Sequence, residues 1–316
     1  IGNDTIGDAF YTHMRGLYLE RCGVAKTEPW TKWTGGACHT VSYQGNFPPD
    51  LEQYRKNAGK EYRNWGFFDR AGHSIDVDHF KLIKLNSSPA TPLPNVSGGW
   101  HDAADYDRRP YHFQIVNDLL AVWLMFPDHF TDGQLNLPES GNGIPDIIDE
   151  ARVGVEVWRR GQRADGGVGT WLEADSHPAE HRPEQDQQPY YLSLATRGSS
   201  LEYAAHASML ALALRECGAA SDSALYLDSA RRAFAFAQDP ANRAQMEYQY
   251  EIDKQPQTIL YFEPQELPAE LLLKAAFNLY ELTRDPSYLK VIRDNERAIL
   301  KALGDLSWRL SPFFLV

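Results

Sequence analysis

Two carboxylates, Asp102 and Asp105, stand three residues apart in the stretch Ser-Gly-Gly-Trp-His-Asp-Ala-Ala-Asp-Tyr at residues 97–106. If this stretch forms one tight turn, both side chains can point the same way. Like charges at that range raise the cost of ionising both groups, which is one route to a tuned general base. The spacing therefore indicates a pair of catalytic carboxylates at the edge of a cleft. An Asp-rich loop that caps a helix is the alternative.

The pattern around this turn predicts helices that would hold it in place. Apolar residues recur at helical spacing over residues 111–126, and Pro110 suits the first turn of that helix. Helices of this length joined by short connections are typical of an array of α/α hairpins. The same periodicity predicts further helices over residues 10–22, 145–158, 200–217, 221–238, 265–283 and 285–303.

A second group of residues, nearer the N-terminus, offers metal ligands. Cys22, Cys38 and His39 provide two thiolates and one imidazole, which leaves one place in a tetrahedral zinc site. The chain has three cysteines, too few for a disulfide framework. Two buried reduced cysteines and a surface histidine are the alternative.

The composition excludes some classes of partner. Among 316 residues there are 31 Lys and Arg against 43 Asp and Glu, a formal net charge of −12. This charge argues against nucleic acid or an anionic membrane surface as the main partner. No apolar run is long enough to span a bilayer. Aromatic residues make up 12% of the chain, and their rings suit stacking on sugars as well as packing in a core.

Residues 98–105, Gly-Gly-Trp-His-Asp-Ala-Ala-Asp, resemble the Gly-Gly-Trp-(Tyr/His)-Asp-Ala-Gly-Asp signature of family 9 glycoside hydrolases, a cellulase family. Residues 142–152, Asn-Gly-Ile-Pro-Asp-Ile-Ile-Asp-Glu-Ala-Arg, closely match another element of that family. Softer matches follow at residues 165–168 and 284–289. The resemblance implies an all-α fold, the (α/α)6 barrel. Residues 1–316 would form a single catalytic domain covering roughly the first two thirds of that barrel, with its C-terminal part missing.

The resemblance also implies a reaction. The protein would be an inverting glycoside hydrolase that cleaves β-1,4-glucosidic bonds in cellulose or related β-glucans. Asp105 would be the general base that activates water, with help from Asp102. Inversion also needs a catalytic acid about 6.5–9.5 Å away across the sugar. In the family this acid is a Glu in the last third of the barrel, so we expect it beyond the visible chain.

Four aromatic or histidine side chains are candidates for substrate contact. They lie in the signature, in a loop that resembles a cleft-lining loop of the family, and in the loop before the next barrel helix. These residues are Trp100, Trp171, His177 and Tyr190.

The segment after Asp105 departs from the pattern of the family. Ala104 replaces the usual Gly, which matters if the turn needs a positive φ there. Arg108 and Arg109 either contact a charged sugar or, as we prefer, form surface salt bridges.

The N-terminal run resembles the branch of the family in which an immunoglobulin-like domain precedes the barrel. That branch implies a structural zinc bound by Cys22, Cys38, His39 and a further histidine. His101 is the favoured fourth ligand, because members without the zinc tend to carry Tyr there. His73 and His79 remain alternatives, and calcium is a second possible cofactor.

Residues 41–95 are polar and irregular, with many Gly and Pro residues, and predict a loop insertion. Residues 81–85 within it form a short strand or helix. Long insertions in compact domains are often binding loops, so we expect this one to shape the cleft near Asp105.

Two other functions fit the same residues. One is an exo-acting glycosidase on chito- or mixed-linkage oligosaccharides, and the other is a catalytically inactive carbohydrate-binding barrel. In each case the partner is a polysaccharide or oligosaccharide, with no nucleic acid and no membrane span. A polymer substrate implies a secreted or periplasmic protein.

Overall fold

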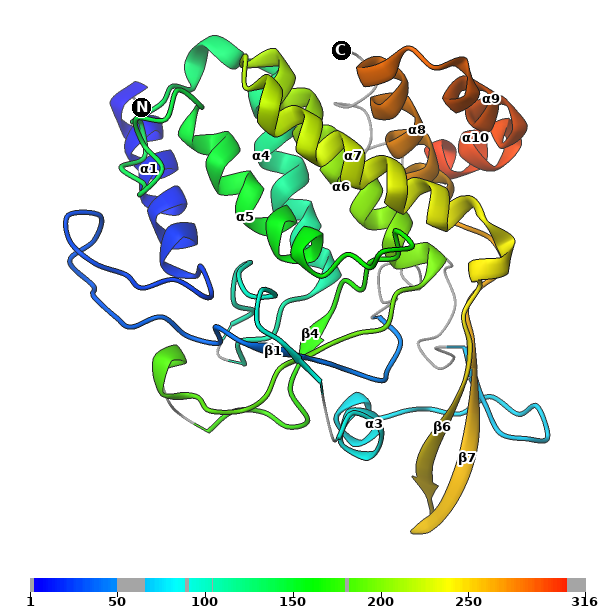
Figure 1. The fold of residues 1–316 in the computed structure, drawn as a ribbon. Coiled ribbons are helices and arrows are strands. Elements are labelled where there is room, and N and C mark those ends of the chain that lie inside the picture. The colour runs from blue at the N-terminus through cyan, green and yellow to red at the C-terminus, as the bar shows by residue number, and fades with distance from the viewer. Residues whose placement is uncertain (1–2, 50–65, 89–90, 104, 180–181, 306–316) are drawn as a thin grey trace.

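Helices dominate the computed structural model, which describes residues 3–49, 66–88, 91–103, 105–179 and 182–305 (Figure 1). The residues described include α1 (Asn3–Leu19), α3 (His79–Asn86), α4 (Phe113–Met125), α5 (Asp146–Arg160), α6 (Arg197–Glu216), α7 (Ala220–Gln238), α8 (Ala269–Thr283), α9 (Pro286–Asp294) and α10 (Glu296–Asp305). The predicted helices are therefore confirmed, although α1 spans Asn3–Leu19 instead of residues 10–22 and α8 begins at Ala269 instead of residue 265. The one expected over residues 285–303 is interrupted at Asn295, which caps α9 before α10 begins.

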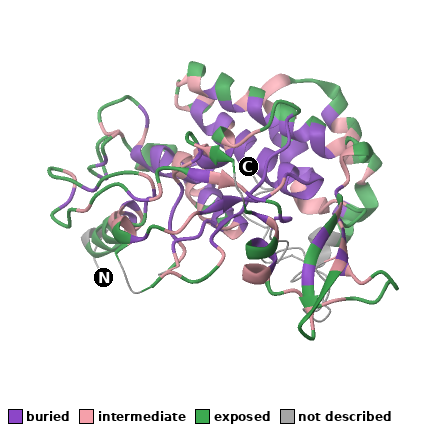
Figure 2. Cartoon of the chain, turned by 60° about the horizontal axis from the view of Figure 1, so that its bottom comes forward, coloured by how far each residue is buried: buried purple, intermediate pink, exposed green. Residues whose placement is uncertain are grey.

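Helix α6 lies at the centre of the array and packs against α4, α5, α7 and α8. Almost every one of its residues is buried, and many of them are Ala or Ser, so neighbouring helices can approach it from several sides. Its first turn is closed by a capping box, in which Thr196 and Ser199 each accept a hydrogen bond from the backbone N–H of the other. Figure 2 shows the buried residues gathered along these helices and in the loops beneath them, with the outward faces exposed.

Helices α4 and α5 hold the signature stretch against the core. Trp100 packs over Gly154 of α5, where a Cβ would meet Cζ3 of Trp100 at 2.3 Å. The Trp100 Nε1 atom donates to Oε1 of Glu150, 2.8 Å away, and Glu150 pairs with Arg21 at 2.8 Å. All three side chains are buried. The stretch before Asp102 is therefore fixed by an ion pair and by helix packing.

A small sheet below the helices carries the loops of the candidate site. Its strands are β1 (Ser42–Gln44), β3 (Pro92–Leu93), β4 (Leu172–Glu173) and β5 (Tyr191–Leu192), in the order β3-β1-β5-β4. Strand β1 pairs parallel to β5 and antiparallel to β3, and β4 pairs antiparallel to β5. An isolated bridge joins Arg108 to Leu172 of β4. The sheet therefore places the segment after Asp105 beside β4.

A second sheet was not expected from the sequence. Strands β6 (Gln245–Ile252) and β7 (Gln255–Phe262) form a long hairpin, and β2 (Phe67–Phe68) adds to β7. Two residues, Asp253 and Lys254, connect the strands with φ values of 51° and 63°. In Figure 1 the hairpin projects below the helices, with α3 beside it. Alternating apolar residues in β6 and this two-residue turn were the available signal for a hairpin.

The predicted insertion is partly ordered into these sheets. Its residues 81–85 are helical, within α3, its ends supply β1 and β3, and β2 lies in its middle. Residues 50–65 of the insertion lie outside the described residues. Among the helices that the structure describes, none combines the length and the apolarity needed to cross a membrane.

Candidate active site

The signature carboxylates lie on one tight turn, as the spacing predicts. The backbone N–H of Asp105 donates to the carbonyl of Asp102 at 3.3 Å, and that of Asp102 donates to the carbonyl of Asp107 at 3.0 Å. Carboxylate oxygens of Asp102, Asp105 and Asp107 all lie within 4.8 Å of one another. The third member, Asp107, was not singled out from the sequence.

The backbone of this turn is strained. Ala103 and Tyr106 have φ values of 47° and 56°, in the left-handed region that side chains other than Gly rarely adopt. Such conformations persist only where surrounding contacts enforce them. Ala104, the residue whose φ was in question, lies outside the described residues.

The carboxylates of Asp102 and Asp105 differ in the hydrogen bonds that their oxygens accept. Asp102 accepts a hydrogen bond from the hydroxyl of Tyr111, and its Oδ1 lies 4.0 Å from Nε2 of His112. The contact with His112, together with that hydroxyl, holds the pKa of Asp102 below its ordinary value although partial burial opposes this. Both partners lie in the short 3-10 turn Pro110–His112 that directly precedes α4, so this turn positions the carboxylate.

Asp105 keeps most of its hydrogen-bonding capacity. Its Oδ2 lies 3.8 Å from Nδ1 of His177, beyond hydrogen-bond distance. Its Oδ1 is buried and accepts no hydrogen bond among the described residues. Its backbone carbonyl, in contrast, accepts a hydrogen bond from the hydroxyl of Tyr190 at 2.8 Å. The backbone of Asp105 is therefore held, while 29% of its side chain is exposed to solvent.

The predicted sugar contacts are corrected for three of the four residues. Trp100, Trp171 and Tyr190 are each at most 3% exposed, which leaves no ring face for a sugar. Trp100 packs in the helical core, and Tyr190 holds the backbone of Asp105. His177 is the exposed member, with 70% of its side chain accessible beside Asp105. Its ring packs edge-on against Phe80 of α3 at 4.6 Å, so the insertion does reach the site.

The segment after the turn is more buried than the sequence suggested. Arg108 is fully buried, and its Nη1 donates to the carbonyl of Tyr106 at 2.5 Å. The prediction of a surface salt bridge is therefore wrong for Arg108. Arg109 does form salt bridges, to Asp107 and Glu173, but its side chain is largely buried as well.

Asp107 and Glu173 form a buried acidic pair beside the turn. Burial raises the pKa of both carboxyls, and Arg109 opposes the shift in each. Trp171 covers the guanidinium, with Cζ of Arg109 lying 4.5 Å from its ring centroid. Glu173 was not singled out from the sequence, because nothing local to β4 signals its burial.

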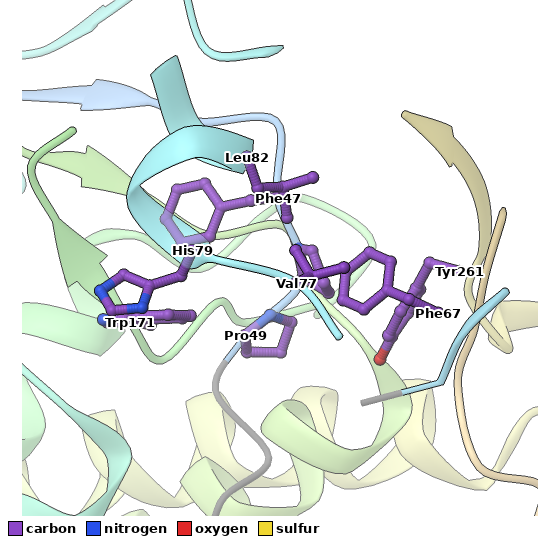
Figure 3. Close-up of a pocket in the computed structure, with 9 residues that line it drawn as sticks. Phe47, Pro49, Phe67, Val77, His79, Leu82, Trp171 and Tyr261 are labelled. Carbon is purple, nitrogen blue, oxygen red and sulfur yellow. The ribbon is translucent and has the colours of Figure 1, made fainter. Parts of the chain in front are cut away.

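Figure 3 shows a cavity lined in part by Trp171. Its walls are mostly apolar and come from the insertion, β4 and the hairpin: Phe47, Pro48, Pro49, Phe67, Val77, His79, Leu82, Trp171 and Tyr261. Burial, and then the charge of Arg109, lowers the pKa of His79 to about 4. His79 is therefore a neutral packing residue here and not a member of the metal cluster.

The candidate metal ligands Cys22, Cys38, His39 and His101 converge. Each offers one donor atom, and these four atoms lie within 4.8 Å of one another. The two Sγ atoms are 3.9 Å apart, Cys22 Sγ is 3.6 Å from His39 Nδ1, and Cys38 Sγ is 3.4 Å from His101 Nε2. A tetrahedral zinc ion has S–S and S–N edges of about 3.8 and about 3.5 Å, given its usual bond lengths. The cluster therefore has the shape of a zinc site, with His101 as the fourth member.

The two histidines of the cluster have outer partners. His39 Nε2 lies 3.1 Å from Oδ2 of Asp186, and His101 Nδ1 lies 3.7 Å from Oε2 of Glu20. A carboxylate on the second ring nitrogen is typical of metal-bound histidine, because it fixes the tautomer. His73 lies elsewhere, exposed and paired with Asp69.

The chain is similar to several known proteins. A family model described as "Glycosyl hydrolase family 9" matches residues 7–311. A xyloglucan-specific endo-beta-1,4-glucanase of Bacteroides ovatus is 30% identical over 180 residues, which cover 54% of this chain and 28% of that protein. A cellulose 1,4-beta-cellobiosidase of Acetivibrio thermocellus is 30% identical over 132 residues, which cover 35% of this chain and 14% of that protein.

Solved structures of family 9 enzymes also resemble this chain. A Zn-binding triple mutant of the family 9 endoglucanase J30 matches 93% of this chain and 48% of its own chain, with a TM-score of 0.62 and 26% identity. This likeness confirms the (α/α)6 fold that the sequence predicted. The chain spans about half the length of that solved relative, and less than a third of the two curated relatives.

Proposed function

The chain belongs to glycosyl hydrolase family 9, and from this premise we propose that it takes part in hydrolysing β-1,4-glucosidic bonds with inversion at the anomeric carbon. Asp105 acts as the general base. It removes a proton from a water molecule as that water attacks the sugar, while a separate acid protonates the leaving oxygen. The observation that carries this proposal is the contrast on one turn, where Asp102 accepts a hydrogen bond from Tyr111 and Oδ1 of Asp105 has no hydrogen-bond partner among the described residues.

Asp102 serves as the helper of the base. Its lowered pKa keeps it ionised, so it can accept a hydrogen bond from the water that Asp105 activates. It is too close to be the acid, because oxygens of Asp102, Asp105 and Asp107 lie within 4.8 Å and inversion needs about 6.5–9.5 Å. We assign no residue of this chain to the acid.

The substrate is a β-1,4-glucan. This choice rests on the printed activities of the relatives, which act on cellulose and xyloglucan. A polymer of this kind places the protein outside the cell or in the periplasm. An exo-acting enzyme on chito- or mixed-linkage oligosaccharides is the alternative that a substrate panel would separate.

The test is Asp105→Asn and Asp105→Ala in the full-length protein, with reducing ends measured on cellulose, xyloglucan, mixed-linkage glucan and chito-oligosaccharides. Loss of a general base should lower kcat about 10²–10⁴-fold while oligosaccharide binding is kept. Asp128→Ala, a change at an exposed residue, is the matched control. Unchanged turnover in the Asp105 variants would refute the base assignment. A wild-type protein that binds sugars without turnover would instead be an inactive carbohydrate-binding barrel.

We also propose that Cys22, Cys38, His39 and His101 hold a structural zinc ion. The donor set and its distances support this, and the description of a solved relative as a Zn-binding triple mutant is compatible with it. Bound zinc would cross-link the end of α1, the loop at residues 38–39 and the signature turn. Metal analysis of protein purified without chelator should find about one zinc per chain. Calcium remains a prediction without assigned ligands.

A further inference from the structure

The metal cluster and the catalytic turn are connected by a chain of buried hydrogen bonds. Oδ2 of Asp186 lies 3.1 Å from Nε2 of His39 and 3.0 Å from the hydroxyl oxygen of Tyr190. The same hydroxyl lies 2.8 Å from the carbonyl oxygen of Asp105. The side chains of His39 and Asp186 are 2% and 3% exposed, and Tyr190 is fully buried. Water therefore has little access to replace these bonds.

The direction of these bonds follows from metal coordination. His39 turns Nδ1 toward the cluster, 3.6 Å from Cys22 Sγ. A metal at that nitrogen leaves the ring proton on Nε2, where Asp186 accepts it. Asp186 is then held as a carboxylate acceptor on the far side of His39. The hydroxyl proton of Tyr190 lies between two acceptors, Asp186 and the Asp105 carbonyl.

A second connection runs through Tyr106, the residue after Asp105. Its ring packs against His39 and His101, with centroids 5.6 and 5.1 Å apart. Tyr106 also has the positive φ that closes the turn. A conformation of that kind needs surrounding contacts to enforce it, and the two ligand histidines supply them.

The backbone on the other side of the turn is tied to the same cluster. Cys22 N–H donates to the carbonyl of Gly99 at 2.8 Å, and His101 N–H donates to the carbonyl of Glu20 at 2.9 Å. His101 directly precedes Asp102. Both ends of the turn therefore depend on segments that carry metal ligands.

From these contacts we infer that metal occupancy positions the catalytic base, and that Asp186 and Tyr190 are the positioning residues that transmit it to the backbone of Asp105. This inference rests on the proposed function, in which Asp105 is the general base. The metal cluster then does more than cross-link distant segments. Bound metal stabilises the backbone conformation of the turn that orients the carboxylate of Asp105. Linkage makes the effect reciprocal, so breaking the connection at Tyr190 must also weaken metal binding.

The test uses Tyr190→Phe and Asp186→Asn in the full-length protein. Tyr190→Phe removes one hydroxyl and keeps the buried ring. Tyr203→Phe is the matched control, because Tyr203 is also fully buried and its hydroxyl is hydrogen-bonded to Ser229 at 2.6 Å, away from the cluster. The first readout is zinc affinity by competition with a chromophoric chelator. Asp186→Asn should lower it about 10–100-fold, Tyr190→Phe should lower it measurably, and Tyr203→Phe should leave it unchanged.

The second readout is kcat and KM with and without zinc. In the wild-type protein, zinc removal should lower kcat with little change in KM. In Tyr190→Phe, kcat should already be low and zinc removal should add little, since the two changes break the same connection. Equal zinc affinity in all variants, or a kcat loss on zinc removal that is as large in Tyr190→Phe as in wild type, would overturn the inference. If the wild-type protein hydrolyses nothing, the proposed function fails, and the zinc affinities alone still decide whether Tyr190 is coupled to the metal.

Discussion

The Nη2 atom of Arg109 lies 2.6 Å from Oε2 of Glu173, a residue 64 positions later in the chain. The same guanidinium donates from Nε to Oδ2 of Asp107. The side chains of Asp107 and Glu173 are 0% and 2% exposed. Two buried carboxyls beside the Asp102–Asp105 turn therefore share the guanidinium of Arg109.

Replacing Arg109 with Met should destabilise the protein strongly. Removing the shared cation leaves Asp107 and Glu173 buried without the partner that opposes their raised pKa values, and we expect a loss of about 3–5 kcal/mol in the free energy of unfolding. Arg109→Lys should recover part of this loss, because a lysine keeps the charge but cannot reach both carboxylates as a planar fork. Urea denaturation measures the unfolding free energy of both Arg109 variants. Arg160→Met, at a half-exposed pair with Glu156, is the control and should change stability by at most about 0.5 kcal/mol. Equal effects at the two arginines would contradict the buried network.

His79 should make stability depend on pH. Burial lowers its pKa from 6.5 to about 4, and Arg109 adds to the shift. The folded state therefore binds fewer protons than the unfolded state. The stability that neutral His79 contributes is fully present above pH 6.5 and is lost as pH falls through about 4.

The variant His79→Phe removes this titration and keeps a flat ring beside Trp171. Between pH 7 and pH 4, wild type should lose about 2 kcal/mol more unfolding free energy than His79→Phe, a value discounted for the partial exposure of the ring. Urea titrations at several pH values measure the difference. His13→Phe, at an exposed position in α1, is the control. Parallel pH curves for wild type and His79→Phe would refute the shifted pKa.

Gly154 should not tolerate a methyl group. A Cβ there would meet Trp100 at 2.3 Å and Val116 at 2.6 Å, and both neighbours are buried. Overpacking of this kind costs about 1–3 kcal/mol, more than the helix propensity that Ala gains over Gly, about 1 kcal/mol. Gly16→Ala in α1 meets nothing within 4 Å and should stabilise the protein. Thermal unfolding of the two variants should therefore shift in opposite directions, and a stabilised Gly154→Ala would disprove the tight contact.

The turn of the hairpin should improve with glycine. Asp253 and Lys254 both have positive φ, as a type I′ turn requires, and a side chain in that region costs roughly 1–2 kcal/mol. Lys254→Gly relieves this cost, but glycine also loses more conformational entropy on folding, which offsets part of the gain. The net effect should be a rise of about 0.5–1 kcal/mol in the unfolding free energy. Lys290→Gly in α9, at an exposed helical position, should instead lower it by about 1 kcal/mol. A destabilised Lys254→Gly would show that the lysine side chain supports the hairpin.

Local chemistry in the sequence determined the helices and the turn from Asp102 to Asp105. Apolar residues at helical spacing mark one face of each helix, and Pro110 marks a helix start, so these elements follow from short-range rules. The turn that joins Asp102 to Asp105 spans so few residues that spacing alone brings the carboxylates together. The β6–β7 hairpin was not predicted, although the alternating apolar residues of β6 are a local signal for a strand.

Only the tertiary structure decided which side chains are buried and what they contact. Trp100 and Tyr190 have the residue types of a sugar platform, yet each is enclosed by distant segments and donates a hydrogen bond there. Arg109 finds Glu173 across the chain, and burial then shifts the carboxyl pKa values. Desolvation and long-range pairing depend on which segments meet, and a residue's type and its neighbours in sequence do not carry that information.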